Sequence, residues 1–327
     1  MNNTGQQVIF LGGDHRSGTT LLSLMLNAHS DLVMGPEIDF LEPANLGVYI
    51  LKCGDLLRQD HPDVRGTGVN TADPQWQKGI QFIRQCQRFG LGLENLMLLV
   101  DDCRQSLGKD PVSFAERCFL IDAIGRFKGR DTQKWGLKIQ RNIVLLEQFL
   151  DVWPQAVFIH LIRDGRDVAA SHIRSTWDWA YRSIEAAAMG WASIVCHPVL
   201  EPSPHLIELK YEDLLLDTKA CLADLLKKLA LPWDHGVLHY WEKEQPLLAQ
   251  PFNHPSAEAV RHPPHQKAIS RYQQDLSAEE IAIFEKIAGT ALQRYGYPRQ
   301  IISPTLTNRV EKEFEKNETA KRRDDFS

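Results

Sequence analysis

The segment VIFLGGDHRSGTTLLSLML, from Val8 to Leu26, constrains the fold more than any other part of the chain. It begins with a β-branched and aromatic run that ends in two glycines, a pattern typical of a buried strand. After Thr19 the apolar residues recur at helical spacing, at Leu21, Leu22, Met25 and Leu26. The segment therefore predicts a strand, a glycine turn and a helix in direct succession, a unit typical of α/β sheets.

The glycine turn is similar to a nucleotide-binding phosphate loop but departs from it at the lysine. That loop has the form G-x-x-x-x-G-K-[ST], whereas Thr19 and Thr20 follow the second glycine here and the positive charge lies on Arg16. A helix N-terminus offers N–H donors and a positive dipole end, so the turn predicts an anion site. The residues expected to take part are Arg16, Ser17, Gly18, Thr19 and Thr20. The alternative is an ordinary glycine turn with a solvated arginine.

Strand and helix patterns alternate along the rest of the chain. Strand patterns cover residues 134–139, 156–164 and 206–209, and helical patterns cover 142–153, 217–231 and about 18 residues after Ser277. Ser277 and Glu280 have the spacing of a capping box. This alternation predicts an α/β fold of three layers, with a mostly parallel sheet, a P-loop-like strand–loop–helix and helical insertions.

The patterns also predict the domain organisation. Residues 1–300 are expected to form a single domain, in which residues 40–130 are a helical insertion on the acceptor side of the site. Residues 245–275 are rich in proline and are predicted to be a lid loop. Residues 303–327 carry many charges and few apolar side chains, which predicts a flexible tail.

Composition narrows the function classes. The 327 residues are 43% hydrophobic and carry a net charge of −5, which argues against a broad nucleic-acid surface. No C-x-x-C pair or other metal-ligand spacing occurs, so the six cysteines are interpreted as reduced, mostly buried thiols. They are Cys53, Cys86, Cys103, Cys118, Cys196 and Cys221. The sequence shows no signal-peptide pattern and no apolar run of membrane-spanning length, so a cytoplasmic location is expected.

A second cluster, IRDGRDVAASHIRS, follows the strand pattern that ends at Arg163. Open α/β sheets bind ligands at this end of their strands. Ser171 lies eight residues further on, within the second turn of a helix that starts near Gly165. An arginine fork and a hydroxyl suit a second phosphate. The alternative interpretation is a set of ordinary ion pairs at a helix start, made by Arg163 with Asp164 and by Arg166 with Asp167.

Together, RSGTTLL and RDGRDVAASHIRS resemble the sulfotransferases that use 3′-phosphoadenosine 5′-phosphosulfate (PAPS). The resemblance covers roughly residues 6–40, 134–230 and 265–297 and is closest to the tyrosylprotein and carbohydrate branch. It implies that the first motif holds the 5′-phosphosulfate. It also implies that Arg163 and Ser171 hold the 3′-phosphate. The product is then adenosine 3′,5′-bisphosphate (PAP), and no metal is required.

The segment AHSDLVMGPEIDF is similar to the region that carries the catalytic base in the tyrosylprotein branch. There a glutamate lies two residues after a glycine, which implies that Glu37 is the base. Pro36 and Asp39 stand where that branch has acidic and basic residues, so peptide recognition is not supported. His29, His160 and His172 are alternative bases, although packing or capping is the more ordinary role for His29 and His160.

Three further residues follow from the resemblance. WGLKIQRN is similar to the strand whose lysine stabilises the transferring sulfonate, which implies Lys138, although Ile139-Gln140 departs from the usual residues after it. YEDL implies that Tyr211 contacts the nucleoside, and AISRYQQDLS implies that Arg271 lies in a loop that closes over the nucleotide. Arg16 and Lys138 would balance charge on the bridging and sulfonate oxygens.

We therefore interpret the chain as a sulfotransferase that moves a sulfonate group from PAPS to a hydroxyl group by in-line transfer. The acceptor is expected to be a carbohydrate, a lipid or a small metabolite. Trp177, Trp179 and Tyr181 either stack on it or pack between helices. The alternatives are a P-loop-type nucleotide kinase and a non-catalytic nucleotide-binding protein. The sequence leaves the acceptor and the oligomeric state open.

Overall fold

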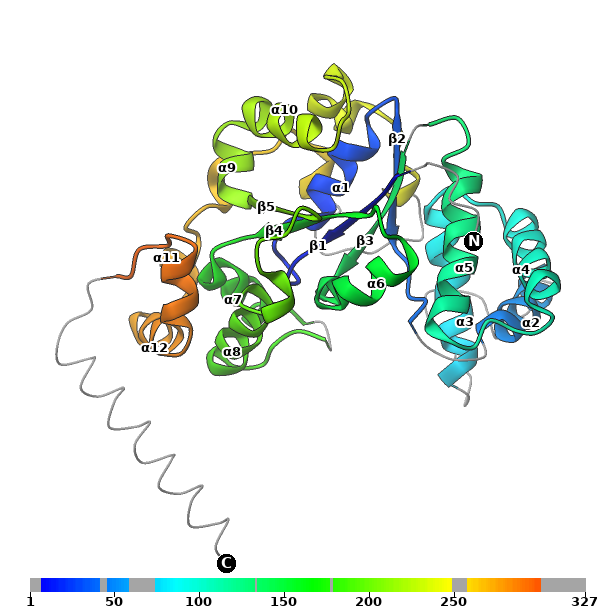
Figure 1. Ribbon diagram of the computed structural model, residues 1–327. Coiled ribbons are helices and arrows are strands. Elements are labelled where there is room, and N and C mark those ends of the chain that lie inside the picture. The colour runs from blue at the N-terminus through cyan, green and yellow to red at the C-terminus, as the bar shows by residue number, and fades with distance from the viewer. Residues whose placement is uncertain are drawn as a thin grey trace, which may run out of the picture.

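Five parallel strands form one sheet in the order β2-β3-β1-β4-β5. The computed structural model, shown in Figure 1, describes residues 7–41, 46–58, 74–132, 134–176, 179–248 and 258–300. The strands are β1 (Gln7–Gly12), β2 (Leu32–Glu37), β3 (Lys134–Gln140), β4 (Val157–Ile162) and β5 (Leu206–Lys210). Because all five are parallel, their carboxyl ends meet at one edge of the sheet, where ligands bind in open α/β folds.

The central strand β1 is covered on both faces, which explains its unbroken apolar sequence. Val8 and Phe10 belong to one apolar cluster, whereas Ile9 and Leu11 belong to another. Successive side chains of a strand point to opposite faces, so these two clusters are the cores above and below the sheet. Strands buried on both faces are typical of parallel sheets.

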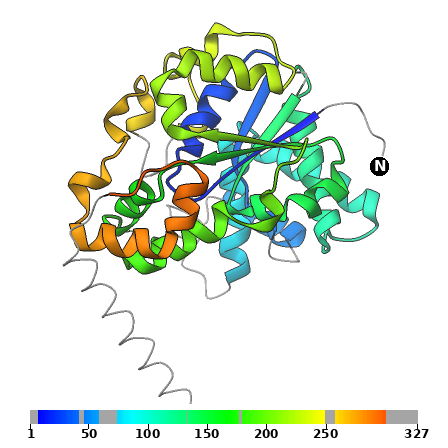
Figure 2. The ribbon, with the colours of Figure 1, turned by 60° about the vertical axis from the view of Figure 1, so that its left-hand side comes forward.

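Helices cover both faces of the sheet and give the three layers that the sequence predicts (Figures 1 and 2). One face carries α1 (Thr19–Asn27), α9 (Tyr211–Leu216) and α10 (Thr218–Lys228). The other carries α6 (Leu146–Val152), α7 (Gly165–Ile173), α8 (Ile184–Val195) and α12 (Ala278–Arg294). The predicted α/β fold class is confirmed.

Four further helices stand together on the side of the sheet where β2 lies (Figure 1). They are α2 (Leu46–Arg58), α3 (Pro74–Arg88), α4 (Leu93–Leu107) and α5 (Phe114–Lys128). A capping box at Ser113 and Glu116 fixes the start of α5. Their apolar faces share one core with Phe10 of β1 and Trp135 of β3, so the group is packed onto the sheet. Its assignment to the acceptor side stays a prediction.

Local signals in the sequence match most element boundaries. Ser277 and Glu280 form the predicted capping box, and α12 runs for 17 residues. The helix predicted over 142–153 is instead a 3₁₀ turn followed by α6. Shorter segments are α11 (Tyr272–Asp275) and 3₁₀ turns at Arg141–Leu145, Pro198–Leu200, His235–Leu238, Tyr240–Glu242, Pro246–Leu248, Ala259–Arg261 and Gln266–Ala268.

Several predictions concern residues that are only partly described. Within 245–275, the described parts hold three 3₁₀ turns and α11, while 249–257 lie outside the described residues. The lid function of this segment stays a prediction. Trp177 and the tail at 303–327 also lie outside the described residues. Across the described residues, no helix has both the length and the apolar character needed to cross a bilayer.

Candidate functional site

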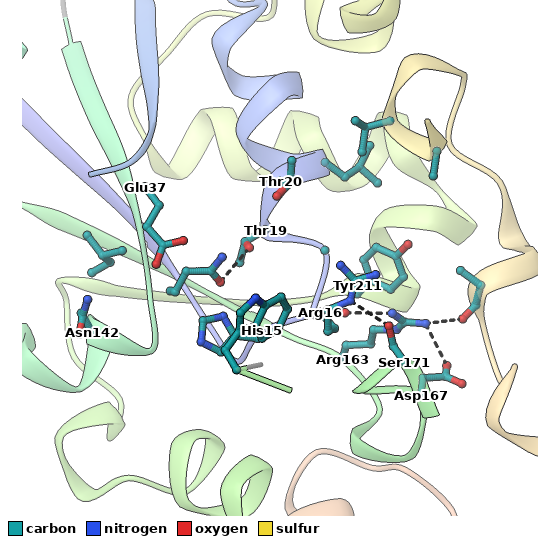
Figure 3. Close-up of a pocket in the computed structure, with 18 of the residues that line it drawn as sticks. His15, Arg16, Thr19, Thr20, Glu37, Asn142, Arg163, Asp167, Ser171 and Tyr211 are labelled. Carbon is teal, nitrogen blue, oxygen red and sulfur yellow. Dashed lines mark hydrogen bonds and ion pairs between the residues drawn. The ribbon is translucent and has the colours of Figure 1, made fainter. Parts of the chain in front are cut away.

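A cavity of about 830 Å³ opens at the carboxyl edge of the sheet. Its walls come from the segments that follow β1, β2, β3 and β4, from α9 after β5, from α3, and from residues 259–275. Figure 3 shows the side chains that converge there, with Glu37 and Asn142 on one side and Arg163, Ser171 and Tyr211 on the other. The volume lies in the range of small-molecule sites, so one medium-sized ligand can span both sides.

The loop after β1 makes the close approach that its glycines predict. Gly18 caps α1 with a φ of +96°, which favours glycine, and a Cβ placed there would lie 2.4 Å from the Tyr211 ring. Thr19 and Thr20 in the first turn of α1 line the cavity. The N-terminus of α1 therefore presents its positive dipole end to the cavity, which is an arrangement that binds anions.

A buried ion pair holds this loop in place. The Asp14 carboxylate accepts hydrogen bonds from the Arg141 side chain at 2.6 Å and from the His15 backbone at 2.8 Å. Burial raises the pKa of Asp14, whereas the Arg141 guanidinium acts in the opposite direction. Arg141 lies directly after β3, so the pair joins the β1 loop to the neighbouring strand.

The two clusters that the sequence singled out meet in space. Arg16 donates from Nε to Oγ of Ser171 at 2.8 Å, and Arg163 donates from Nη1 to the Arg16 carbonyl at 2.9 Å. Arg163 also donates to the Ala268 carbonyl at 2.8 Å and lies over the Tyr211 ring at 4.9 Å. Burial, then the neighbouring Arg163, lowers the pKa of Arg16. Two guanidinium groups held this close favour an anionic ligand.

The alternative interpretation as helix-start ion pairs predicted the wrong partners, because Arg166 pairs with Asp164 and Arg163 lies 3.8 Å from Asp167. The Arg166 guanidinium is buried and pairs with Asp164 at 2.7 Å and with Glu285 of α12 at 2.5 Å. Asp164 also caps α7 by accepting from the Arg166 backbone. Arg166 therefore anchors α7 to α12, whereas Arg163 and Arg174 of the same cluster line the cavity.

Asp167 holds in place residues 270–272, a segment that is called the late segment below and carries Arg271. Its buried carboxylate accepts the backbone N–H groups of Ser270 at 2.9 Å and Tyr272 at 2.8 Å. Arg271 lines the cavity while its Nε lies 2.8 Å from Asp275. Asp167 thus positions the late segment against the same helix that carries Ser171.

Glu37 and Lys138 lie side by side at the ends of β2 and β3. Pro36 lacks an N–H, and the register shifts there, so that Glu37 pairs directly with Lys138. Glu37 Oε2 lies 3.7 Å from Lys138 Nζ, which also donates to Thr20 Oγ1 at 3.3 Å. The Lys138 side chain is only 6% exposed, and burial lowers its pKa. A carboxylate, an ammonium and a hydroxyl therefore converge beside the helix N-terminus.

Most of the predicted site residues line the cavity. They are Arg16, Gly18, Thr19, Thr20, Glu37, Arg163, Ser171, Tyr211 and Arg271. Ser17 is buried within the loop, and Lys138 is buried next to the lining residues Glu37 and Thr20, which it contacts.

The three alternative bases lie away from the cavity lining. His29 uses both ring nitrogens structurally, with Nδ1 accepting from the Asp31 backbone and Nε2 facing the Pro232 carbonyl. His160 is fully buried on β4, and His172 is buried in α7, where burial lowers its pKa to about 4. Glu37 is therefore better placed than these histidines to reach an acceptor in the cavity.

The structure adds site residues that the sequence interpretation missed. His15, Gln140 and Asn142 line the cavity. Burial lowers the pKa of His15 to about 3, so its imidazole is neutral at pH 7. Trp179 lines the cavity and contacts the His15 ring at a tilt of 46°, whereas Tyr181 lies under the Arg141 guanidinium. His15 lies inside the loop motif, which was the one signal in the sequence that pointed to it.

Comparison with known proteins places the chain in a family. A family model described as the sulfotransferase family matches residues 8–235. Protein-tyrosine sulfotransferase 1 of Danio rerio is 24% identical over 246 residues, which are 73% of this chain and 58% of that protein. The chain thus spans little more than half the length of this relative.

Solved structures share the fold. The sulfotransferase domain from the curacin biosynthetic pathway has a TM-score of 0.57 at 16% identity and covers 95% of this chain and 98% of its own. The sulfotransferase domain of the Synechococcus PCC 7002 olefin synthase has a TM-score of 0.54 at 17% identity. The match covers 86% of this chain and 94% of that domain. Given a family match over most of the chain, this protein belongs to the sulfotransferase family.

Proposed function

We propose that the chain transfers a sulfonate group from PAPS to a hydroxyl group of an acceptor. The observation that carries this proposal is the junction of two anion-binding segments within one cavity. Arg16 from the β1 loop and Ser171 from α7 lie 2.8 Å apart, so a single nucleotide with phosphates at both its 3′ and 5′ positions can contact both segments.

The chemistry of the donor set fits such a nucleotide. The buried Nε of Arg163 has no hydrogen-bond partner among the described residues, which is costly unless an acceptor reaches it. Arg163 and Ser171 would hold the 3′-phosphate, and the β1 loop with the α1 N-terminus would hold the 5′-phosphosulfate. Tyr211, stacked beside Arg163, would contact the nucleoside, and Arg271 would close over it.

The residues around the reacting atoms have separate roles in the transfer. When bound, the donor supplies the sulfonate, whose bond to the 5′-phosphate oxygen breaks as the acceptor oxygen bonds to sulfur. Glu37 takes the proton from the acceptor hydroxyl, a role that contributes about 10²–10⁴-fold in rate in other enzymes. Lys138 holds the Glu37 carboxylate in place, and with Arg16 it stabilises negative charge near Thr20.

Two classes of acceptor are candidates. The Danio rerio relative is named a protein-tyrosine sulfotransferase, which makes a tyrosine phenol one candidate acceptor. The hydroxyl of a carbohydrate, a lipid or a small metabolite is the other candidate. A cytoplasmic location also remains a proposal.

Replacing Glu37 with glutamine tests the proposed chemistry. We expect Glu37→Gln to lower transfer of ³⁵S from labelled PAPS by about 10²–10⁴-fold while binding of adenosine 3′,5′-bisphosphate is kept. The matched control is Glu94→Gln, which removes an exposed carboxylate on α4 that pairs with Arg58. Full transfer by Glu37→Gln contradicts the assignment of the base.

Thermal unfolding of the wild-type protein with different ligands, together with a transfer assay, distinguishes the three candidate functions. A sulfotransferase is stabilised against heat by adenosine 3′,5′-bisphosphate in the presence of EDTA, because ligand binding to the folded state raises the melting temperature. A nucleotide kinase would be stabilised by ATP with Mg²⁺ and would lose this effect in EDTA. A non-catalytic protein would bind the bisphosphate and transfer no sulfonate to any acceptor.

A further inference from the structure

Gln140, the last residue of β3, has a strained backbone. Its φ of 49° and ψ of −130° lie in a region that glycine prefers and that residues with a side chain rarely adopt. Such conformations cost free energy, persist only where the surrounding structure enforces them, and cluster at active sites. Because glycine would avoid the strain, the presence of a glutamine here points to a role for its side chain.

The loop after β1 holds the Gln140 backbone in this conformation. The Gln140 carbonyl accepts a hydrogen bond from the Gly13 N–H at 3.1 Å. A Cβ placed on Gly12 would lie 2.7 Å from the same carbonyl oxygen, so the loop approaches it closely. The strained residue is therefore packed directly against the loop that is proposed to bind the 5′-phosphosulfate.

The start of α1 orients the Gln140 side chain. Gln140 is buried, and its Oε1 accepts a hydrogen bond from Thr19 Oγ1 at 3.2 Å. This bond uses the oxygen of the amide and leaves the two N–H donors of Nε2 for another partner. Nε2 has no hydrogen-bond partner among the described residues, and Gln140 lines the cavity. The amide therefore offers hydrogen-bond donors to a ligand in the cavity.

The order of the strands places the transferring group near the end of β3. In-line transfer requires the sulfur to lie between the 5′-phosphate at the β1 loop and the acceptor oxygen beside Glu37 of β2. The strand between β1 and β2 is β3. Lys138 and Gln140 of β3 both contact the first turn of α1. Figure 3 shows Glu37 on one side of Thr19 and Arg16 on the other, as this order requires.

We propose that Gln140 is a further catalytic residue, whose amide Nε2 donates a hydrogen bond to an oxygen of the transferring sulfonate. This inference rests on the proposed sulfonate transfer and adds one neutral donor to it. In that step the bond between sulfur and the 5′-phosphate oxygen breaks, and its electron pair stays on the phosphate. The acceptor oxygen bonds to sulfur, and its proton passes to Glu37. A fixed amide donor stabilises the sulfonate oxygens and exchanges no proton.

The test compares the binding of PAPS and of adenosine 3′,5′-bisphosphate, which lacks only the sulfonate. Calorimetry without an acceptor measures both affinities for the wild type and for Gln140→Met, in which the side chain keeps its length and loses its N–H donors. Loss of a hydrogen bond to a charged group should weaken PAPS about tenfold or more, whereas the affinity for the bisphosphate should stay within about threefold. Gln148→Met, at an exposed position on α6, is the matched control and should change neither affinity.

A glycine variant separates the strain from the hydrogen bond. Glycine adopts a positive φ without steric cost, so Gln140→Gly should melt at a higher temperature than Gln140→Met. Both variants should lose affinity for PAPS relative to the bisphosphate. A residue that only stabilises the fold would show the opposite order of melting temperatures, which would contradict the inference.

The two ligands also separate failure of this inference from failure of the proposed function. If Gln140→Met weakens PAPS and the bisphosphate equally, Gln140 only holds the loop and the catalytic assignment is wrong. The assignment is also wrong if neither affinity changes. If the wild type binds neither ligand, the proposed function itself fails and the inference fails with it.

Discussion

Replacing Arg141 with methionine should destabilise the protein far more than the loss of a surface charge. Arg141 is 32% exposed, but its partner Asp14 is fully buried, and the second carboxylate oxygen of Asp14 has no hydrogen-bond partner among the described residues. Removing one member of a buried pair leaves an uncompensated charge and costs roughly 3–5 kcal/mol. Because Arg141 is partly exposed, we expect the lower end, about 3 kcal/mol, which lowers the melting temperature of a chain of this length by roughly 4 °C.

The loss of stability caused by Arg141→Met should increase as the pH rises. Burial already raises the pKa of Asp14 in the folded state, and loss of Arg141 raises it further. A carboxyl group with a raised folded pKa binds its proton more tightly when folded, so stability falls as pH rises above the unfolded pKa. The stability of Arg141→Met should therefore be close to that of the wild type at acidic pH. The full loss of stability should appear at pH 7.

Thermal unfolding at pH 7 and at about pH 4 measures this directly. Asp14→Asn combined with Arg141→Met should be more stable at pH 7 than Arg141→Met alone, because the buried charge is gone. Arg130→Met, at a highly exposed position, is the control and should stay within about 0.5 kcal/mol of wild type. The reasoning about the buried pair is refuted if Arg141→Met and the wild type have the same melting temperature at pH 7. It is also refuted if the double variant is no more stable than Arg141→Met.

Two further predictions concern the nucleotide half of the cavity. Gly18→Ala should cost about 2–4 kcal/mol in thermal unfolding, because it strains a backbone with a φ of +96° and crowds the Tyr211 ring, whereas Gly92→Ala, which meets nothing within 4 Å, should be tolerated. Equal melting temperatures for the two variants would contradict this. Asp167→Ala should weaken bisphosphate binding at least tenfold in calorimetry, because the segment that carries Arg271 loses its two backbone hydrogen bonds. Unchanged affinity would remove Asp167 from its positioning role.

Local patterns were enough to predict most of the sheet. The strands β1 and β4 are mostly apolar, whereas the apolar residues of β3 and β5 are interrupted by glycine or charged residues, and each of the four is predicted from its own residues. The strand β2 was missed because Gly35 and Pro36 interrupt its pattern. Proline is tolerated there because β2 lies at the edge of the sheet and the register shifts at that point.

The site residues that lie close together in the sequence could be predicted from their spacing, whereas those brought together by the sheet could not. Arg163 and Ser171 lie on one strand end and the helix that follows, so their spacing alone suggested that they act together. Glu37 and Lys138 lie about a hundred residues apart, and only the register of β2 against β3 makes them neighbours. They were suggested by the family resemblance and not by spacing. The Asp14–Arg141 pair had no signal in the sequence, because its partners lie on segments joined only in the folded sheet.

The central claim is that one nucleotide is held at both of its phosphates, and calorimetry with two ligands tests it most directly. Adenosine 3′,5′-bisphosphate and adenosine 5′-monophosphate differ only in the 3′-phosphate that Arg163 and Ser171 are proposed to bind. We predict that the wild type prefers the bisphosphate by at least about tenfold, and that the Arg163→Ala/Ser171→Ala variant binds the two ligands nearly equally. A wild type that does not distinguish the ligands, or a double variant that keeps the full preference, would contradict the account.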